Sequence, residues 1–168
     1  MASSAKTNNN PVRMSLFRQV WWQAFNTPLS GFSLADGSAN GKVKLTMEGY
    51  DDVTSSDHIS KFGYRIKGRV YTLQSDANSN AKDDFWDLTG QTDLTSGDYV
   101  KVLLTVDESG NAQTHVSSVA SSQNEAELPV PPDDECPFGW IEMEGANDWD
   151  GESLSTSGSY YEGYDVLR

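Results

Sequence analysis

The sequence predicts a mainly β protein, an antiparallel β-sandwich or jelly-roll-like domain with an N-terminal arm and one short helix. Seven or eight short apolar segments recur at roughly ten-residue spacing, separated by Gly, Ser, Asn and Asp, as in sandwich folds. No long amphipathic helix separates them, which disfavours a parallel α/β fold. With 168 residues, 36% of them hydrophobic, the chain has the length of one domain. We therefore expect residues 1–41 to form an arm with a short aromatic helix and a linker, and residues 42–168 to form the sandwich.

The first 41 residues contain the predicted arm, helix and linker. Residues 1–11 are mostly polar and have little to bury. The segment 12–25 spaces its apolar residues as one stripe of a helix, at Phe17, Val20, Trp21, Ala24 and Phe25. Pro28 favours an end to that helix, because the residue before a proline avoids the α region. Residues 29–41, rich in Gly and Ser, are expected to form a loop or linker.

Alternating apolar residues predict the first strands of the sandwich. The segment 42–50 places Val43, Leu45 and Met47 on one face. The segment 62–74 predicts a hairpin that turns at Lys67 and Gly68. Residues 75–84 are expected to form a loop, and the aromatic segment 85–90 a short strand.

The second half of the chain contains the strongest strand signal. Apolar residues dominate 102–106, so the segment 98–107 predicts a central strand buried on both faces. A tight turn over 107–110 then sends 111–120 back antiparallel. A Pro-rich acidic connector over 121–135 leads to a strand at 138–143. One further strand is expected near 160–166.

Charge divides the chain into two unlike parts. The formal net charge is −13; residues 1–70 carry nine Lys and Arg against five Asp and Glu, whereas residues 71–168 carry three against twenty. An acidic surface repels phosphate groups, so we expect neither nucleic acid nor an anionic membrane as a partner. The asymmetry indicates either two faces with different neighbours or a uniformly solvated acidic surface.

The sequence also indicates a compartment. Cys136 is the only cysteine, so the fold cannot depend on an intrachain disulfide. No apolar run approaches the length of about 20 residues that a membrane span needs. Residues 1–13 lack the apolar core of a signal peptide. We expect synthesis in a cytosol.

Histidine and cysteine offer little chemistry. His58 and His115 lack the spacing of metal ligands, and Cys136 has no partner thiol. Three acidic residues precede Cys136 and should raise its pKa, which disfavours a nucleophilic thiolate. We expect no cofactor and no metal.

Two carboxylate pairs, Asp83/Asp84 and Asp148/Asp150, are the candidates for general acid–base work. Both lie in polar segments where the carboxylates stay ionised, whereas a general acid needs a raised pKa. The segment 147–152 has oxygen ligands at alternate positions, but lacks the full ligand pattern of a calcium loop and predicts a turn. We therefore expect that the chain is not an enzyme.

The predicted helix carries the candidate partner-binding residues. They are the aromatic and arginine side chains Arg13, Phe17, Arg18, Trp21, Trp22 and Phe25. One interpretation is that the aromatic rings cap the core of the sandwich. The other is that they anchor the chain to a partner, since Trp, Phe and Arg are enriched in interfaces.

Five segments follow one another in a recognisable order: FGYRIKGRVY (62–71), FWDLTG (85–90), LTSGDYVKVLLTVDESGNA (94–112), LPVPPDD (128–134) and CPFGWIEM (136–143). In this order they resemble small virion structural proteins of tailed bacteriophages, some of them capsid decoration, or cement, proteins. The resemblance implies a β-sandwich that assembles as a homotrimer on the exterior of the phage head. Its partner would be the major capsid protein, whose neighbouring subunits it would bridge after synthesis in the host cytoplasm.

Two other functions remain open. The chain is also compatible with a tail, baseplate or head-fibre component that binds a receptor. A carbohydrate-binding module is the third hypothesis, in which exposed Trp86, Trp140 or Trp149 stack on sugar rings.

Overall fold

Strands make up most of the part of the chain that the structure describes. The computed structural model describes residues 25–48, 59–146, 148–151 and 153–163. The elements, in chain order, are β1 (Thr27–Pro28), β2 (Phe32–Asp36), β3 (Lys42–Met47), β4 (Lys61–Ile66), β5 (Arg69–Gln74), β6 (Ala81–Asp87), β7 (Tyr99–Asp107), β8 (Ala112–Val116), β9 (Glu135–Glu144), the 3-10 helix η1 (Leu154–Thr156) and β10 (Gly158–Glu162). No helix among these residues is long and apolar enough to cross a membrane.

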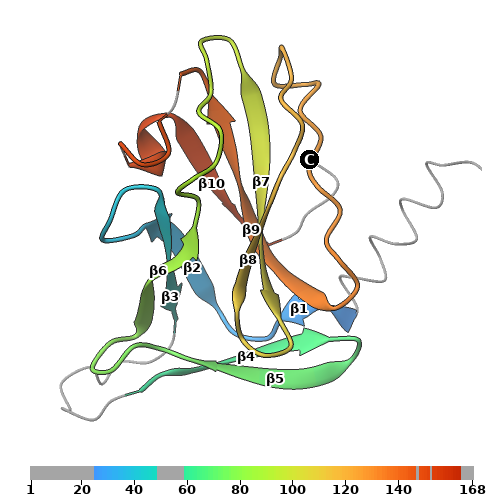
Figure 1. Cartoon of the computed structure of the whole chain (residues 1–168). Helices are drawn as coiled ribbons and strands as arrows, with labels where there is room; N and C mark the ends of the chain where they lie inside the picture. The colour runs from blue at the N-terminus through green and yellow to red at the C-terminus, as the bar shows by residue number, and fades with distance from the viewer. Residues whose placement is uncertain (1–24, 49–58, 147, 152, 164–168) are drawn as a thin grey trace, which may run out of the picture.

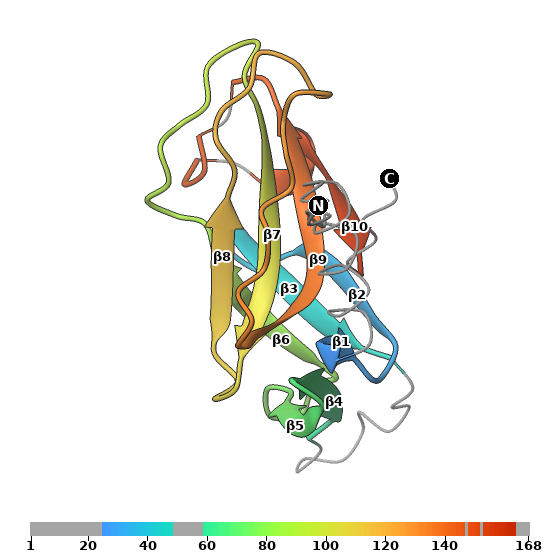
Figure 2. The ribbon, with the colours of Figure 1, turned by 90° about the vertical axis from the view of Figure 1, so that its right-hand side faces the viewer.

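The strands form three antiparallel sheets. Their orders are β2–β3–β6, β10–β9–β7–β8 and β1–β4–β5. The first two face each other as the layers of a sandwich, and the small sheet β1–β4–β5 lies across one end of it (Figures 1 and 2). The predicted mainly β, antiparallel sandwich is therefore confirmed.

The core lies between the two larger sheets. Strand β3 alternates as predicted, with Val43, Leu45 and Met47 fully buried. Phe138 of β9 lies at the centre of an aromatic cluster, with ring centroids 5.3–6.1 Å from those of Phe32, Phe62, Tyr64 and Trp86. Burial of such large rings contributes more apolar area per residue than any aliphatic side chain does.

Strand β7 is buried on both faces, as its apolar run predicts. Val102 and Leu104 belong to the core between the sheets, whereas Leu103 and Thr105 are buried on the opposite face. In the described part of the chain no further sheet covers that opposite face. The connector between β8 and β9 folds back beside the sheet, where the backbones of Ala120 and Tyr99 pair.

The hairpin of β4 and β5 forms where the sequence predicts it. Its two-residue turn, Lys67–Gly68, has positive φ at both positions, 50° and 79°. Such a turn matches the right-handed twist of the flanking strands, and glycine adopts it at little cost. All six residues of each strand pair in register, from Lys61↔Gln74 to Ile66↔Arg69.

Two loop predictions are wrong. Residues 29–41 do not form only a linker, because β2 lies within them and pairs with β3. Residues 75–84 do not form only a loop, because β6 begins at Ala81. Short strands between Gly- and Ser-rich turns have too few apolar residues to give a period, so tertiary pairing decides them.

The packing of β2 explains how so weak a segment becomes a strand. Leu34 is buried against Gly139 of β9, where a side chain on the glycine would lie 2.6 Å from Leu34 Cδ1. The same Cβ would lie 2.3 Å from the carbonyl oxygen of Tyr161. Glycine at position 139 therefore lets β2 and β10 approach β9 closely.

The ends of the chain differ from the prediction in extent. Strand β10 covers Gly158–Glu162 rather than beginning near Tyr160, and residues 164–166 lie outside the described residues. Strand β9 is longer than predicted and begins at Glu135. The predicted helix lies outside the described residues except for Phe25.

Candidate docking surface

The small sheet β1–β4–β5 carries most of the exposed apolar side chains. Six large apolar side chains of the described residues are more than a third exposed, and four of them (Phe25, Leu29, Ile59 and Val70) lie on this sheet or next to it. Val70 is the most exposed, at 63%. Exposed apolar residues that gather in one place mark interaction sites more often than scattered ones do.

Strand alternation places several of these side chains on one outer face. Gly63 pairs with Thr72, and Arg65 pairs with Val70. Leu29 lies over the same face, because a Cβ on Gly63 would be 3.6 Å from Leu29 Cβ. We define the docking surface by the apolar and basic residues of this outer face, Leu29, Lys61, Arg65 and Val70, together with Phe25, Lys67 and Arg69 at the β4–β5 turn.

The docking surface is basic in a chain that is strongly acidic overall. The segment 59–75 contains Lys61, Arg65, Lys67 and Arg69 and no Asp or Glu. Within the described part of the chain, no carboxylate forms an ion pair with Lys67 or Arg69. A basic patch of this kind attracts acidic partners and orients them as they approach.

An acidic turn lies beside the docking surface. Tyr64 donates its hydroxyl hydrogen bond to the carbonyl oxygen of Asp107, 2.9 Å away, so the β7–β8 turn lies beside β4. The Asp107 carboxylate accepts from the amides of Ser109 and Asn111, at 2.8 and 2.9 Å. Burial opposes its charge, but these hydrogen bonds outweigh burial and lower its pKa.

Asn26 fixes the start of the described chain to this surface. Its side chain is 2% exposed, and its amide donates to the carbonyl oxygens of Asp133 (3.0 Å) and Glu135 (2.8 Å). Its own side-chain oxygen accepts from the backbone N–H of Lys67, at 2.7 Å. Asn26 therefore joins the backbone just before β1 to the β4–β5 turn and to the beginning of β9.

Of the predicted partner-binding residues, the structure describes one. Phe25 is 37% exposed and lies at the docking surface, where its carbonyl oxygen accepts from the amide of Gly68, 3.1 Å away. The others (Arg13, Phe17, Arg18, Trp21 and Trp22) lie outside the described residues. In the sequence they shortly precede Phe25. The sequence did not single out the hairpin itself, although its run of four basic residues without an acid was a visible signal.

The tryptophans proposed to stack on sugars are buried, so that premise is wrong. Trp86 and Trp149 lie in the core and donate their indole N–H to the carbonyl oxygens of Thr105 (2.8 Å) and Thr92 (3.0 Å). Trp140 is stacked on Tyr161, with ring centroids 4.1 Å apart. Indoles satisfied in this way stabilise the fold and offer no open face to a sugar.

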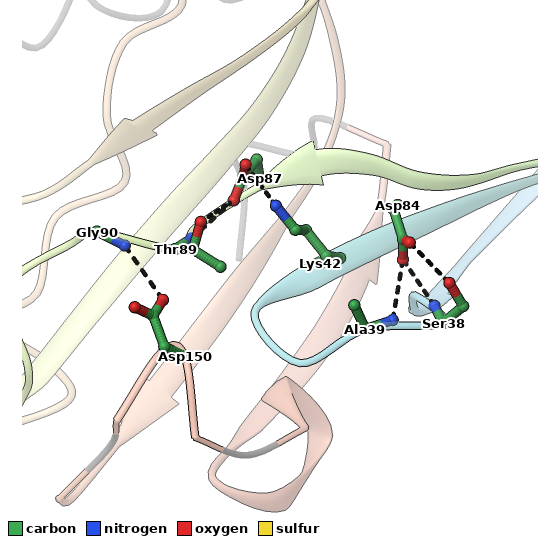
Figure 3. Close-up of polar contacts among 8 residues, drawn as sticks. All are labelled: Ser38, Ala39, Lys42, Asp84, Asp87, Thr89, Gly90 and Asp150. Carbon is green, nitrogen blue, oxygen red and sulfur yellow. Dashed lines mark hydrogen bonds and ion pairs between the residues drawn. The ribbon is translucent and has the colours of Figure 1, made fainter.

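Two of the candidate carboxylates, Asp84 and Asp150, cap loops, as Figure 3 shows. Asp84 accepts from the amides of Ser38 (2.7 Å) and Ala39 (3.1 Å) in the β2–β3 loop. The hydrogen bond from the Ser38 hydroxyl, followed by that from the Ala39 amide, lowers the pKa of Asp84. Asp83 pairs with Lys44 instead, at 2.8 Å.

The second pair behaves in the same way. Asp150 accepts from the amide of Gly90, 3.2 Å away, and Asp148 accepts from the amide of Asp150, 3.1 Å away (Figure 3 for Asp150). Asp87, beside them, forms an ion pair with Lys42 and binds Thr89. These contacts join the β6–β7 loop to the segment between β9 and η1 and to the start of β3, at the end of the sandwich away from the docking surface.

Cys136 is buried, and burial raises the pKa of its thiol to about 12. The direction agrees with the sequence prediction, but the cause is loss of solvation rather than the neighbouring acidic residues. His58 lies outside the described residues. No group of three metal-ligating side chains occurs among the residues that the structure describes.

His115 has a partner that the sequence did not reveal. Its Nε2 lies 2.6 Å from the Glu135 carboxylate and 3.3 Å from the hydroxyl of buried Thr105. The three residues come from β8, β9 and β7, so the contact depends on sheet order, which strand periodicity does not give. Because Glu135 also supplies a carbonyl oxygen to Asn26, this cluster supports the attachment point of the chain end.

Comparison with known proteins adds no identification. No family model matches the chain, no curated protein matches it, and no solved structure matches its fold. The resemblance to phage virion proteins therefore stays a prediction.

Proposed function

We propose that this chain is a virion structural protein of a tailed bacteriophage, a capsid decoration protein that binds the exterior of the head. It attaches to the major capsid protein and stabilises neighbouring subunits by holding them together. It acts as a homotrimer, as the resemblance of its segments to such proteins implies. It binds and does not catalyse.

One observation carries the proposal: the attachment features coincide at one end of the molecule. The exposed apolar and basic side chains of the β4–β5 hairpin lie around Asn26, and the aromatic and basic segment 12–25 directly precedes that residue in the sequence. Residues 71–168 carry twenty acidic residues against three basic ones, which suits an outward-facing side. A chain built in this way attaches by one end.

The test uses phage particles that lack the protein. A variant without residues 1–24 retains Phe25 and Asn26, so it is expected to fold and melt like the full chain. Full-length protein is expected to bind the particles and to raise the temperature at which they release DNA, whereas the shortened variant does neither. Light scattering of the free protein tests the trimer.

Imaging of labelled full-length protein on the particles decides the location. Label on the head supports the proposal. Label on tails or fibres overturns it in favour of a tail, baseplate or head-fibre component, and no binding to any particle overturns both. Full binding by the shortened variant would show that residues 1–24 are not the anchor.

A further inference from the structure

We infer that β5 is a strand-addition site, at which an extended acidic segment of the partner pairs with the outer edge of the small sheet. This deepens the proposed function and rests on it for the identification of the partner as a capsid protein. The mode of binding rests on the geometry of the hairpin alone.

The register of the hairpin shows which backbone groups face outward. The Ser75 amide bonds to the Ser60 carbonyl oxygen, so 60↔75 is a hydrogen-bonded pair. Antiparallel pairs alternate, which makes Val70, Thr72 and Gln74 the residues that do not bond to β4. Their N–H and C=O groups point away from β4.

The β1 side of the sheet confirms this orientation. The amide of Leu29 donates to the carbonyl oxygen of Gly63, at 2.8 Å. Gly63 pairs with Thr72, so the odd-numbered residues of β4 use their backbone toward β1. Their partners on β5 therefore present backbone groups to the opposite edge.

That edge has no partner among the described residues. Strand β5 pairs only with β4, and within this part of the chain the backbones of Val70, Thr72 and Gln74 form no other hydrogen bond. The strand is regular over its whole length and contains neither proline nor a bulge. Proline, a bulge and charge are the usual protections of such an edge, and of these β5 has only charge, at Arg69.

The positive charge of the hairpin indicates that the segment that binds to this edge is acidic. The hairpin has four basic residues and no acidic ones, and Arg69 lies on β5 itself. Two hairpins of one sign repel each other, so the edges of two copies do not suit one another. In an incoming strand with a carboxylate at every second residue, all carboxylates lie on one face of the extended sheet. They come near Arg65 if that is the outer face and near Arg69 if it is the inner face. Main-chain hydrogen bonds supply affinity in this mode, and side chains supply selection.

The first measurement is NMR on the full chain with two synthetic peptides, (Glu-Val)4 and (Lys-Val)4. The glutamate peptide is expected to shift the amide signals of Val70, Thr72 and Gln74. It is also expected to slow their hydrogen exchange by on the order of tenfold at saturation, since each N–H gains an acceptor. Equal binding of the lysine peptide, or shifts that avoid β5, would overturn the inference.

The second measurement uses a matched pair of variants. Val70→Pro removes one outward N–H and no bond to β4, whereas Val70→Thr keeps the N–H and the shape. The proline variant is expected to lose glutamate-peptide binding, and the threonine variant to retain it. Dimerisation of the free protein through β5 would also contradict the inference. If the proline variant does not fold, the wild-type exchange data decide alone.

The two proposals fail separately. Peptide binding at β5 without binding to particles removes the proposed function and leaves strand addition. Particle binding that Val70→Pro does not weaken removes strand addition and leaves the proposed function.

Discussion

The two ends of the sandwich use charge in opposite ways. At the loop end, Asp84, Asp87 and Asp150 accept hydrogen bonds from backbone amides of neighbouring loops (Figure 3). At the docking surface, Lys67 and Arg69 have no carboxylate partner among the described residues, although acidic residues outnumber basic ones twofold in the chain. The carboxylates at the loop end thus have partners within the protein. The cations at the docking surface have no carboxylate partner in the described part of the chain and can attract an acidic partner molecule.

The two ends also differ in how far their apolar side chains are buried. Near the loop end, Trp149 and Leu154 are fully buried, whereas Val70 and Leu29 at the small sheet face solvent. The comparison teaches that net charge alone does not locate a binding surface. What locates it is the place where polar and apolar groups both lack internal partners.

The largest expected effect is at the point where the chain end joins the docking surface. Asn26→Ala removes three hydrogen bonds made by a buried side chain and takes the acceptor away from the Lys67 amide, which is expected to lower the free energy of unfolding by about 3 kcal/mol. Urea denaturation measures it. The control is Asn40→Ala at the loop end, where an exposed side chain donates one bond to Gly151 and the loss is expected to stay below about 1 kcal/mol. Equal losses in the two variants would contradict the anchoring role of Asn26.

Removing the two positive charges of Lys67 and Arg69 is expected to change the free energy of unfolding little. It is expected to weaken binding to the particles strongly. Lys67→Gln with Arg69→Gln is expected to change the free energy of unfolding by less than about 0.5 kcal/mol, because both side chains are exposed. Binding to particles is expected to weaken and to lose most of its dependence on salt. Ser118→Glu with Asn124→Glu makes the same change in net charge at exposed positions elsewhere. Equal weakening in both double variants would show that only net charge matters.

The smallest expected effect is on the loss of thermal stability at acidic pH. Hydrogen bonds lower the pKa of Asp84 below its ordinary 3.8. The ionised carboxylate therefore contributes fully to the free energy of unfolding above about pH 4, and this contribution is lost as the pH falls through the folded-state pKa. Asp84→Asn is expected to narrow the difference between the melting temperatures at pH 7 and pH 2.5. Asparagine also tolerates the positive φ of 52° at this position. The control is Asp93→Asn, whose carboxylate accepts no hydrogen bond within the described residues; an equal narrowing there would contradict the loop-capping role.

Periodicity found the strong elements and missed the weak ones. The alternation of Val43, Leu45 and Met47 and the apolar run of β7 are local patterns, and both strands form where these patterns predict. Strand β2 has no such pattern, because its place depends on pairing with β3 and on the contact between Leu34 and Gly139. Local propensity cannot decide a segment that long-range contacts stabilise.

The same limit applies to the candidate site. The sequence singled out aromatic residues, but did not show that Trp86 and Trp149 lie in the core while Val70 faces solvent. It gave the basic run of 61–69 without showing that these residues border an unpaired strand edge. Exposure depends on what packs against a side chain, which is a property of sheet order.

The sequence by itself determined the β class, the hairpin turns and the separation of basic from acidic segments, because each of these depends on residues close together in the chain. Only the tertiary structure decided which strand edges are paired, which rings are buried and which charges have partners. Contacts such as Asn26 with Glu135 and His115 with Glu135 join residues far apart in the sequence. Their formation depends on how the sheets stack, and periodicity contains no information about stacking.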